Sequence, residues 1–269
     1  MADMAAEQRD RVRSLERALD VLEAIGSAGE LGVSEVSART DLGTSTAHRL
    51  MATLADRGYL SQNAANGRYA LGAKVLELAK ALDVRTSALR SAARPHLERV
   101  SAATGESANL VVLDGRRVIY VDQVEGSHSV RMFTELGSTA LAHTTGSGKA
   151  ILAFQPTPAL ARLYPPEAEP LEGLTPHTLR TLAALEDDFA RIRRRGYALD
   201  NEEHEEGVSC VATAIFDATG APIAAISLSG PTSRVIRADT GELGALLHRH
   251  AAEISETLGY RAEPGAAAG

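Results

Sequence analysis

The chain has 269 residues, of which 44% are apolar and 23% charged, enough for two domains and a well-buried core. Its single cysteine, Cys210, excludes an intramolecular disulfide and a multi-cysteine zinc site, and indicates a reducing, cytoplasmic compartment. No apolar run approaches the roughly 20 residues that a membrane span needs, and the N-terminus lacks the apolar segment of a signal peptide, so we expect no contact with a membrane.

The net charge of −7 is unevenly distributed. Residues 1–90 hold 12 Lys and Arg against 12 Asp and Glu, whereas residues 91–269 hold 16 against 23. Within residues 42–74 the only acidic residue is Asp56. A local basic patch is what contact with phosphates requires, and the sum over the whole chain hides it.

The first 70 residues carry three helical segments and a hairpin. Apolar residues recur at helical spacing from Ser14, a predicted N-cap, to Ala28, and Gly29 is a predicted stop. Shorter helices are predicted in SEVSARTDL, with Ser34 as N-cap, and in GTSTAHRLMATLADRG, after a tight turn at Gly43. YLSQ and RYAL then alternate like strands around the turn NAANG. This order is typical of a winged helix-turn-helix.

The exposed face of the third helix suits double-stranded DNA. Hydroxyl residues at its start can donate to phosphates, and arginine one turn deeper can pair with guanine. Arg68 follows the hairpin turn, where a wing would contact the DNA backbone or minor groove. The candidate contacts are Thr44, Ser45, Thr46, His48, Arg49, Thr53, Arg57 and Arg68. The alternative is a winged helix used for protein contacts, with Arg49 and Arg57 merely solvated.

A further helix is predicted from about Gly72. Its apolar residues Val75, Leu78, Ala79 and Leu82 form a narrow stripe, for which the first domain offers no remaining partner. We therefore interpret this helix as a linker and a contact between two copies of the chain.

From Ser91 the chain alternates between helices and hairpins. A helix through Leu97 and Val100 precedes two strands joined at Asp114-Gly115, and SVRMFTELG (129–137) is predicted as a third strand. A loop and helix in HTTGSGKAILAF, a helix in LEDDFARIRRRG, a long acidic loop, a second hairpin and an amphipathic C-terminal helix follow. Antiparallel hairpins with flanking helices predict an α+β domain built on one central sheet.

The segment HTTGSGKAIL resembles a phosphate-binding loop but lacks essential parts of it. His143 occupies the position of the first glycine, and Ala150 occupies the position of the hydroxyl residue that holds Mg²⁺. We therefore expect no nucleotide hydrolysis. Two interpretations stay open: an anion site at the helix N-terminus, or a glycine that permits close packing of helix and sheet.

The acidic loop DNEEHEEGVSC also has more than one interpretation. Asp200, His204 and Cys210 could ligate a metal, but their irregular spacing favours a solvated loop beside a buried cysteine. The four neighbouring glutamates would raise the pKa of a thiol, which argues against a catalytic cysteine. Ser227 and Ser229 lie two apart and thus on one face of a strand, where they can form a polar wall for a small carboxylate or serve only as satisfied polar groups.

Together these motifs resemble the IclR (isocitrate lyase regulator) family of transcription factors from about Ser14 to Tyr260. The matching stretches are SLERALDVLEAI, STAHRLMATLADRGYL, RYALG, HTTGSGKAILA, RRRGYALDNEEHEEGVSCVATAIFD and AAISLSGP. The resemblance implies a C-terminal effector domain of GAF/PAS-like type with a six-stranded antiparallel sheet. It also implies homodimers or dimers of dimers on palindromic operators.

The resemblance further implies the ligand contacts. In family members that bind small carboxylates, the matching positions are Gly146, Ser147, Asp200, Cys210, Ser227 and Ser229. The family's apolar wall matches Ser129, Ala140 and Val208, which implies a wider pocket for an aromatic acid or a larger metabolite.

From the sequence we expect a nucleoid-associated regulator that binds DNA and a small organic acid and uses no cofactor, metal or catalytic residue. The alternative is an enzyme with a DNA-binding appendage that uses Cys210 or a metal in the acidic loop. The expected segments are a disordered N-terminus (1–12), a winged helix-turn-helix (13–72), a linker helix (73–90), an effector-binding domain (91–260) and a disordered tail (261–269).

Overall fold

The computed structural model of the chain describes residues 12–236 and 239–261, with the side chains of 81–85 left out. Apart from Val12 and Arg261, the segments predicted to be disordered lie outside the described residues. The chain divides into two compact units, Met1–Arg85 and Thr86–Gly269.

Three helices form most of the first unit: α2 (Arg13–Ala28), α3 (Val33–Thr40) and α4 (Thr44–Asp56). The N-caps differ from the prediction, because α2 begins after Val12 and α3 after Gly32, whose amide donates to the Glu35 carboxylate at 2.7 Å. The predicted tight turn before α4 is present. Its left-handed residue is Asp41 (φ 51°), however, while Gly43 has an ordinary φ of −58° and caps α4.

A small antiparallel sheet completes this unit. It contains β1 (Glu30–Leu31), β2 (Leu60–Gln62) and β3 (Tyr69–Leu71) in the order β1-β3-β2. The hairpin was predicted, whereas the two-residue β1 was missed because it is too short to show alternation. One apolar cluster joins the helices to the sheet, with Val21, Ile25, Val36, Ala47, Met51, Leu60 and Tyr69 among its members.

A single 32-residue helix, α5 (Ala73–Thr104), runs from the first unit into the second. The sequence predicted two separate helices over this stretch. Pro95 lies inside α5 and removes one backbone donor without ending the helix. The apolar residues after it, Leu97 and Val100, are fully buried against the second unit, and this packing carries the helix through the proline.

The second unit is built on a six-stranded antiparallel sheet with the order β6-β5-β4-β9-β8-β7. Its strands are β4 (Ser107–Asp114), β5 (Arg117–Val124), β6 (Thr139–Leu141), β7 (Ala198–Asn201), β8 (Val208–Phe216) and β9 (Pro222–Pro231). The fold is therefore α+β, with a helix-turn-helix and small sheet followed by a domain on one antiparallel sheet.

Two predictions about these strands were wrong. The predicted strand 129–137 is a loop, and the third strand of the domain is β6 instead. The backbone of 129–137 bonds to side chains and not to a neighbouring strand: the Met132 carbonyl accepts from the Ser107 hydroxyl at 2.5 Å. Part of the predicted acidic loop is β7, whose Asp200 pairs with Cys210 of β8.

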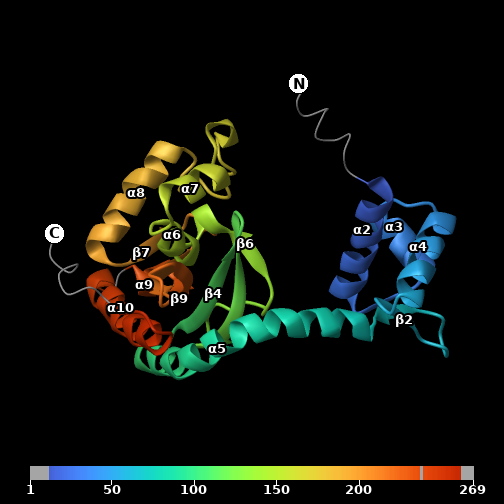
Figure 1. Cartoon of the computed structure of the whole chain (residues 1–269), viewed down its shortest axis with the longest axis horizontal. Helices are drawn as coiled ribbons and strands as arrows, with labels where there is room; N and C mark the ends of the chain where they lie inside the picture. Colours follow the sequence, from blue (N-terminus) through green and yellow to red (C-terminus); the bar gives the residue numbers. More distant parts are fainter. Residues whose placement is uncertain (1–11, 237–238, 262–269) are drawn as a thin grey trace. The chain divides into compact units, whose positions relative to one another are not determined.

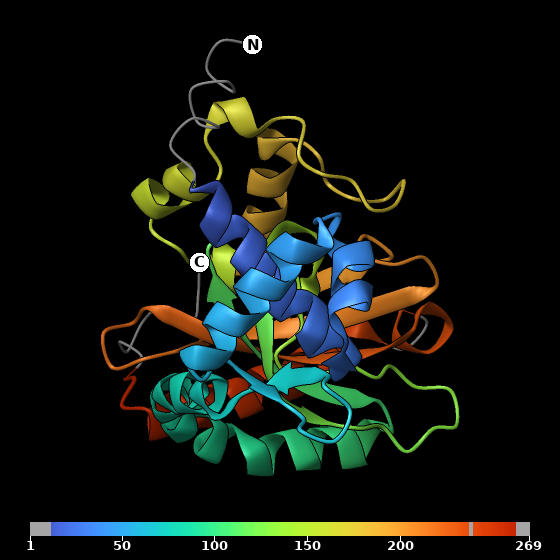
Figure 2. The ribbon, with the colours of Figure 1, turned by 90° about the vertical axis from the view of Figure 1, so that its right-hand side faces the viewer.

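Helices cover the two faces of this sheet differently (Figures 1 and 2). The C-terminal half of α5 and α10 (Thr240–Thr257) lie side by side on one face, over a continuous apolar core that includes Leu97, Leu110, Ile226 and Ile254. The short α9 (Thr232–Val235) follows β9 directly.

The opposite face carries α6 (Gly146–Leu152), α7 (Thr157–Leu163) and α8 (Leu182–Arg195), with short 3₁₀ turns at Ala142–Thr144 and Pro166–Ala168. The second apolar cluster lies there and includes Val111, Ile151, Phe189 and Ala212. At one end of this face the apolar side chains give way to polar ones.

Candidate functional site

The predicted DNA contacts of α4 share one exposed face. Thr44, Ser45, His48, Arg49, Thr53 and Arg57 are exposed and Thr46 is half-buried, while Ala47 and Met51 fill the core beneath. The Thr53 hydroxyl bonds back to the Arg49 carbonyl at 2.8 Å. Arg49 and Arg57 have no acidic partner among the residues that the structure describes. Their positive charges are thus available to an anionic partner.

Arg68 is placed differently from the other predicted contacts. Its guanidinium lies 2.8 Å from a carboxylate oxygen of Glu35 and 3.6 Å from one of Glu30, and it donates to the Glu30 carbonyl. Two carboxylates therefore neutralise this cation and tie the hairpin to β1 and α3. The interpretation of Arg68 as a free wing contact is not supported by this geometry.

In the second unit, adjacent strands bring four predicted residues together. Asp200 lies opposite Cys210, and Cys210 lies opposite Ser229. Ser227 is two residues before Ser229 on the same strand and lies opposite Ala212. Alternation along the strands turns all four side chains to the face that carries α6, so we call this set, with Asn109 of β4, the polar face. Asp200, Cys210, Ser227 and Asn109 are buried.

The N-terminus of α6 lies directly over the polar face. A Cβ added to Gly146 would lie 3.1 Å from the Cys210 sulfur and 3.4 Å from the Asp200 amide. The Thr145 side chain caps the helix by accepting from the Gly148 amide, and no described group accepts from the amides of Gly146 and Ser147. The structure therefore brings together all six predicted effector contacts.

Gly148 has a packing role. A Cβ there would lie 2.1 Å from the Ala142 carbonyl oxygen, so only glycine lets α6 approach the preceding turn. Two interpretations were left open for this segment. Close packing applies at Gly148, while the amides of Gly146 and Ser147 stay available to an anion.

Burial dominates the electrostatics of the polar face. It raises the pKa of the Cys210 thiol to about 11, with the nearby Asp200 adding to the rise. The neighbouring hydroxyls of Ser229, Ser227 and Ser147 partly oppose the shift. The buried Ser227 hydroxyl has no hydrogen-bond partner among the described residues. A thiol with such a pKa is not a nucleophile at neutral pH.

Burial also raises the pKa of Asp200 to about 7. Two amides of the following loop oppose this rise, since Asp200 Oδ1 accepts from Glu203 N at 2.7 Å and His204 N at 3.4 Å. Asp200 can therefore be neutral or charged near physiological pH.

Lys149, which matches the lysine of a phosphate-binding loop, is only 1% exposed. Its Nζ lies 2.5 Å from Glu203 Oε1 and 3.0 Å from Asp188 Oδ2. We call these three residues the buried ion triad. Because both carboxylates neutralise Lys149, it is not available to a phosphate, in agreement with the expectation of no nucleotide hydrolysis.

The acidic loop does not form the metal site that was considered for it. The His204 ring bonds to the Thr144 hydroxyl at 2.9 Å, and Asp200, His204 and Cys210 do not converge among the described residues. The loop is also less solvated than expected, since Glu203 is 7% exposed and its carbonyl accepts from Thr178 at 2.6 Å.

Two residues near this site were missed by the sequence interpretation. Asn109 donates to the Ser229 hydroxyl at 3.3 Å, and an asparagine in the apolar run SANLVVL was the available signal. Burial raises the pKa of the Tyr120 phenol on β5, and the nearby Cys210 and Asp200 add to the rise. No sequence signal marked Tyr120, because a tyrosine is ordinary in a half-buried strand.

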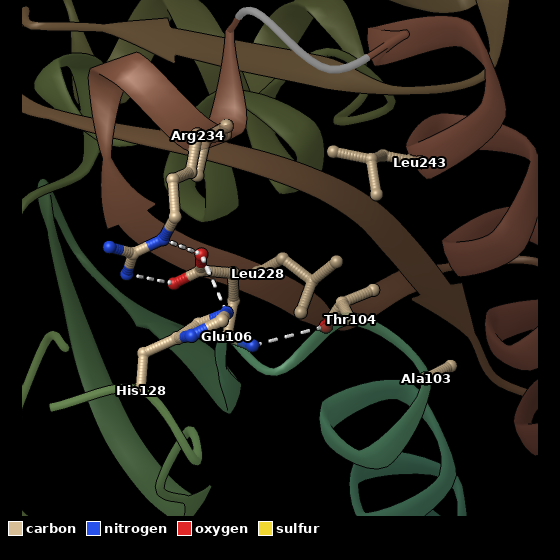
Figure 3. Close-up of a pocket in the computed structure, with 8 residues that line it drawn as sticks. Ala103, Thr104, Glu106, His128, Leu228, Arg234 and Leu243 are labelled. Carbon is tan, nitrogen blue, oxygen red and sulfur yellow. Dashed lines mark hydrogen bonds and ion pairs between the residues drawn. The ribbon is translucent and has the colours of Figure 1, made fainter. Parts of the chain in front are cut away.

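Two cavities in the described part of the chain lie away from the polar face. The larger, about 610 Å³, is lined by residues of α7 and α8 and of the segments next to them, such as Phe154, Tyr164 and Phe189. Figure 3 shows the smaller, about 250 Å³, where Glu106 pairs with Arg234 and His128 on the face covered by α5 and α10. Because the Glu106 carboxylate already has both partners, this cavity offers few free polar groups.

No helix in the described residues combines the length and apolar character needed to cross a membrane.

Comparison with family models matches both units. The IclR helix-turn-helix domain matches residues 14–64, and the C-terminal domain of bacterial transcriptional regulators of the IclR type matches residues 81–256. Among curated proteins, the HTH-type transcriptional regulator BhcR of Paracoccus denitrificans is 37% identical over 262 residues, which cover 97% of this chain and 93% of the relative.

Solved structures show the same similarity to the IclR family. The crystal structure of the Thermotoga maritima IclR is 33% identical, with a TM-score of 0.73, and the match covers 93% of this chain and 100% of that one. An IclR homologue from Microbacterium hydrocarbonoxydans, crystallised with 4-hydroxybenzoate, is 26% identical, with a TM-score of 0.74 and coverage of 91% and 98%.

Proposed function

The chain belongs to the IclR family of bacterial transcriptional regulators, and from that premise we propose that it controls a metabolic, catabolic operon in response to a small organic acid bound at the polar face. The observation that carries the proposal is the convergence of Asp200, Cys210, Ser227 and Ser229 beneath the free amides at the start of α6.

For DNA, we propose that α4 is the recognition helix. The hydroxyls of Thr44, Ser45 and Thr46 meet phosphates together with the free amides of the helix start. Arg49, one turn deeper, reads a base edge in the major groove, and Arg57 contacts a phosphate. The absence of acidic partners for both arginines, within the described residues, supports this assignment.

For the effector, we propose a carboxylate that accepts from the amides of Gly146 and Ser147 and from the Ser227 hydroxyl. A buried hydroxyl without a partner costs free energy, and a ligand oxygen would remove that cost. The raised pKa of Asp200 supports the same assignment, because a neutral carboxyl can donate to an anion that a charged one would repel.

For assembly, we propose a homodimer or a dimer of dimers on a palindromic operator. Exposed leucines support it: Leu15 and Leu19 on α2 are 59% and 48% exposed, and Leu78 of the predicted linker stripe is 54% exposed. Leu82 of the same stripe falls among the side chains that are not described. A monomer gains nothing from such exposed leucines, whereas a second copy would bury them.

The alternative of an enzyme with a DNA-binding appendage has lost its support. The relatives are transcriptional regulators along nearly their whole length, and the thiol it relied on is protonated at neutral pH.

The test couples ligand to operator. Small aliphatic acids and 4-hydroxybenzoate are screened for a rise in the melting temperature of the full-length protein, and each hit is added to a titration with the gene's own upstream DNA. Ligand and operator must change each other's affinity by the same factor.

A matched pair of variants localises the site. Ser227→Ala removes an unpartnered hydroxyl on the polar face, and Thr213→Val removes one on the opposite face of the same sheet. We expect the ligand response to weaken only in Ser227→Ala. An equal response of both variants would refute the assignment of the polar face.

A further inference from the structure

Three potential metal ligands converge far from the polar face. His96 of α5 and His250 and Glu253 of α10 each offer one atom, and these atoms lie within 4.8 Å of one another. The two Nδ1 atoms are 3.0 Å apart, and Glu253 Oε2 lies 3.6 Å from His96 Nδ1. In the described ranges, 12–236 and 239–261, no other group of three His, Cys, Asp or Glu side chains comes as close.

The two helices hold these side chains in a fixed relation. His250 and Glu253 are three residues apart and thus on one face of α10, and both lie close to His96 of α5. Next to the three ligands, Leu97, Ala251 and Ile254 are at most 1% exposed and lie in the same apolar core. The cluster therefore stands on a rigid scaffold, as a metal site requires.

The orientation of the rings suits chelation. The two imidazole planes are inclined by 74°, and their Nδ1 atoms face each other. Two nitrogen ligands at about 2.0–2.1 Å from a tetrahedral zinc ion are about 3.3 Å apart, so a shift of a few tenths of an ångström would admit the ion.

Arg99 contacts the His96 ring without occupying the in-plane lone pair of Nδ1, which a metal ion would need. Its NH2 nitrogen lies 3.1 Å from Nδ1 and 3.2 Å from Nε2 of the ring. A nitrogen so nearly equidistant from both ring nitrogens would clash with the carbon between them if it lay in the ring plane. It therefore lies over the face of the ring, and the in-plane lone pair of Nδ1 stays directed at His250.

We propose that His96, His250 and Glu253 bind one divalent transition-metal ion of the zinc type, which clamps α5 to α10. Two imidazoles and one carboxylate are the ligands that zinc accepts. His96 is 8% exposed whereas the Glu253 side chain is 58% exposed, so one side of the site is open for entry of the ion and for a water as fourth ligand.

The experiment titrates Zn²⁺ into the full-length protein after treatment with a chelator, with calorimetry for affinity and thermal unfolding for stability. We expect saturable binding at this site and a higher melting temperature. Loss of one ligand in His250→Asn or Glu253→Gln should lower the affinity at least about tenfold, since even indirect changes around metal sites cost about 10–100-fold.

His248→Asn is the matched control, because His248 is an exposed histidine on the same helix outside the cluster. It should bind Zn²⁺ as the natural chain does. Binding that is absent in the natural chain, unchanged in both ligand variants, or reduced as strongly in the control would overturn the proposal. His250 and Glu253 are not fully buried, so their variants should fold even if a His96 variant does not.

Discussion

Lys149 and Glu203 are 54 residues apart in the chain, yet the lysine Nζ lies 2.5 Å from the glutamate Oε1 in the interior of the second unit. Asp188 completes the buried ion triad at 3.0 Å. The triad joins α6, whose first amides we assign to the effector, to the loop whose amides hold Asp200. The segment that looked like a nucleotide site is thus held in place by its own lysine.

Replacement of Lys149 by methionine tests the importance of the triad. The change leaves the buried Glu203 carboxylate without its cation and Asp188 with only the exposed Arg191, which should lower the free energy of unfolding by about 3–5 kcal/mol. Urea denaturation measures the loss. The control is Arg191→Met, which removes an exposed partner of the same Asp188 at 3.2 Å and should cost less than about 1 kcal/mol. Similar losses in both variants would contradict the role of the buried lysine.

Arg49→Ala should weaken specific operator binding by about 1–3 kcal/mol, because one base contact is lost, while the melting temperature stays unchanged. Fluorescence anisotropy with the operator and with a scrambled duplex measures the two affinities at one salt concentration. Arg162→Ala, an exposed arginine of α7, is the control. An operator affinity equal to that of the natural chain would show that the recognition face has been placed wrongly.

Arg68→Ala should behave in the opposite way. Its ion pairs with Glu30 and Glu35 are about one-third exposed or more, so their loss should lower stability by only about 0.5–1 kcal/mol. The salt dependence of operator binding should be unchanged, whereas Arg57→Ala should reduce its slope by about one. A reduced slope in the Arg68 variant would restore this residue to the DNA interface.

The raised pKa of Asp200 predicts that the stability of the folded chain depends on pH. Its pKa is about 7 in the folded chain, against about 3.9 when unfolded, so the folded state holds the proton more tightly. The contribution of Asp200 is therefore greatest below pH 4 and is lost as the pH rises toward 7. Relative to Asp200→Asn, the natural chain should lose about 1–3 kcal/mol between pH 5 and 8, measured by denaturation. A constant difference would contradict the raised pKa.

The protonation state of Asp200 should also control the affinity for the effector. Because a charged Asp200 repels a carboxylate, the dissociation constant of an anionic effector should rise up to about tenfold per pH unit above 7. Calorimetry from pH 6 to 8.5 measures it. Asp200→Asn keeps a neutral side chain and should bind independently of pH, and a parallel rise in this variant would assign the effect to another group.

Periodicity and turn residues were sufficient to predict most of the fold. The three helices of the first unit and α10 were predicted from the regular spacing of their apolar residues, and the hairpins from their turn residues, although Leu15 and Leu19 of α2 are exposed and not buried. The strand expected at 129–137 was wrong since alternation alone does not supply a partner strand, and the Ser107 hydroxyl bonds to that backbone instead. The continuity of α5 through Pro95 follows from tertiary packing, which local sequence does not encode.

The site was predicted to the extent that its residues stand in recognisable motifs. The pairing of Asp200 with Cys210 depends on β7, which is four residues long and was read as a loop. Arg68 looked free because its partner Glu30 is 38 residues away in a strand that the sequence did not show. Contacts over such distances arise from topology and leave no trace in spacing.

The alternation of β9 has a consequence for how such regulators diverge. Ile226 and Leu228 pack into the apolar core, while Ser227 and Ser229, which alternate with them, belong to the polar face. If the polar face binds the effector as proposed, substitutions at every second position change the ligand contacts without touching the residues of the apolar core behind the sheet. Such a sheet places the proposed ligand contacts and the core residues on opposite faces, so that ligand specificity can change with little effect on the stability of the domain.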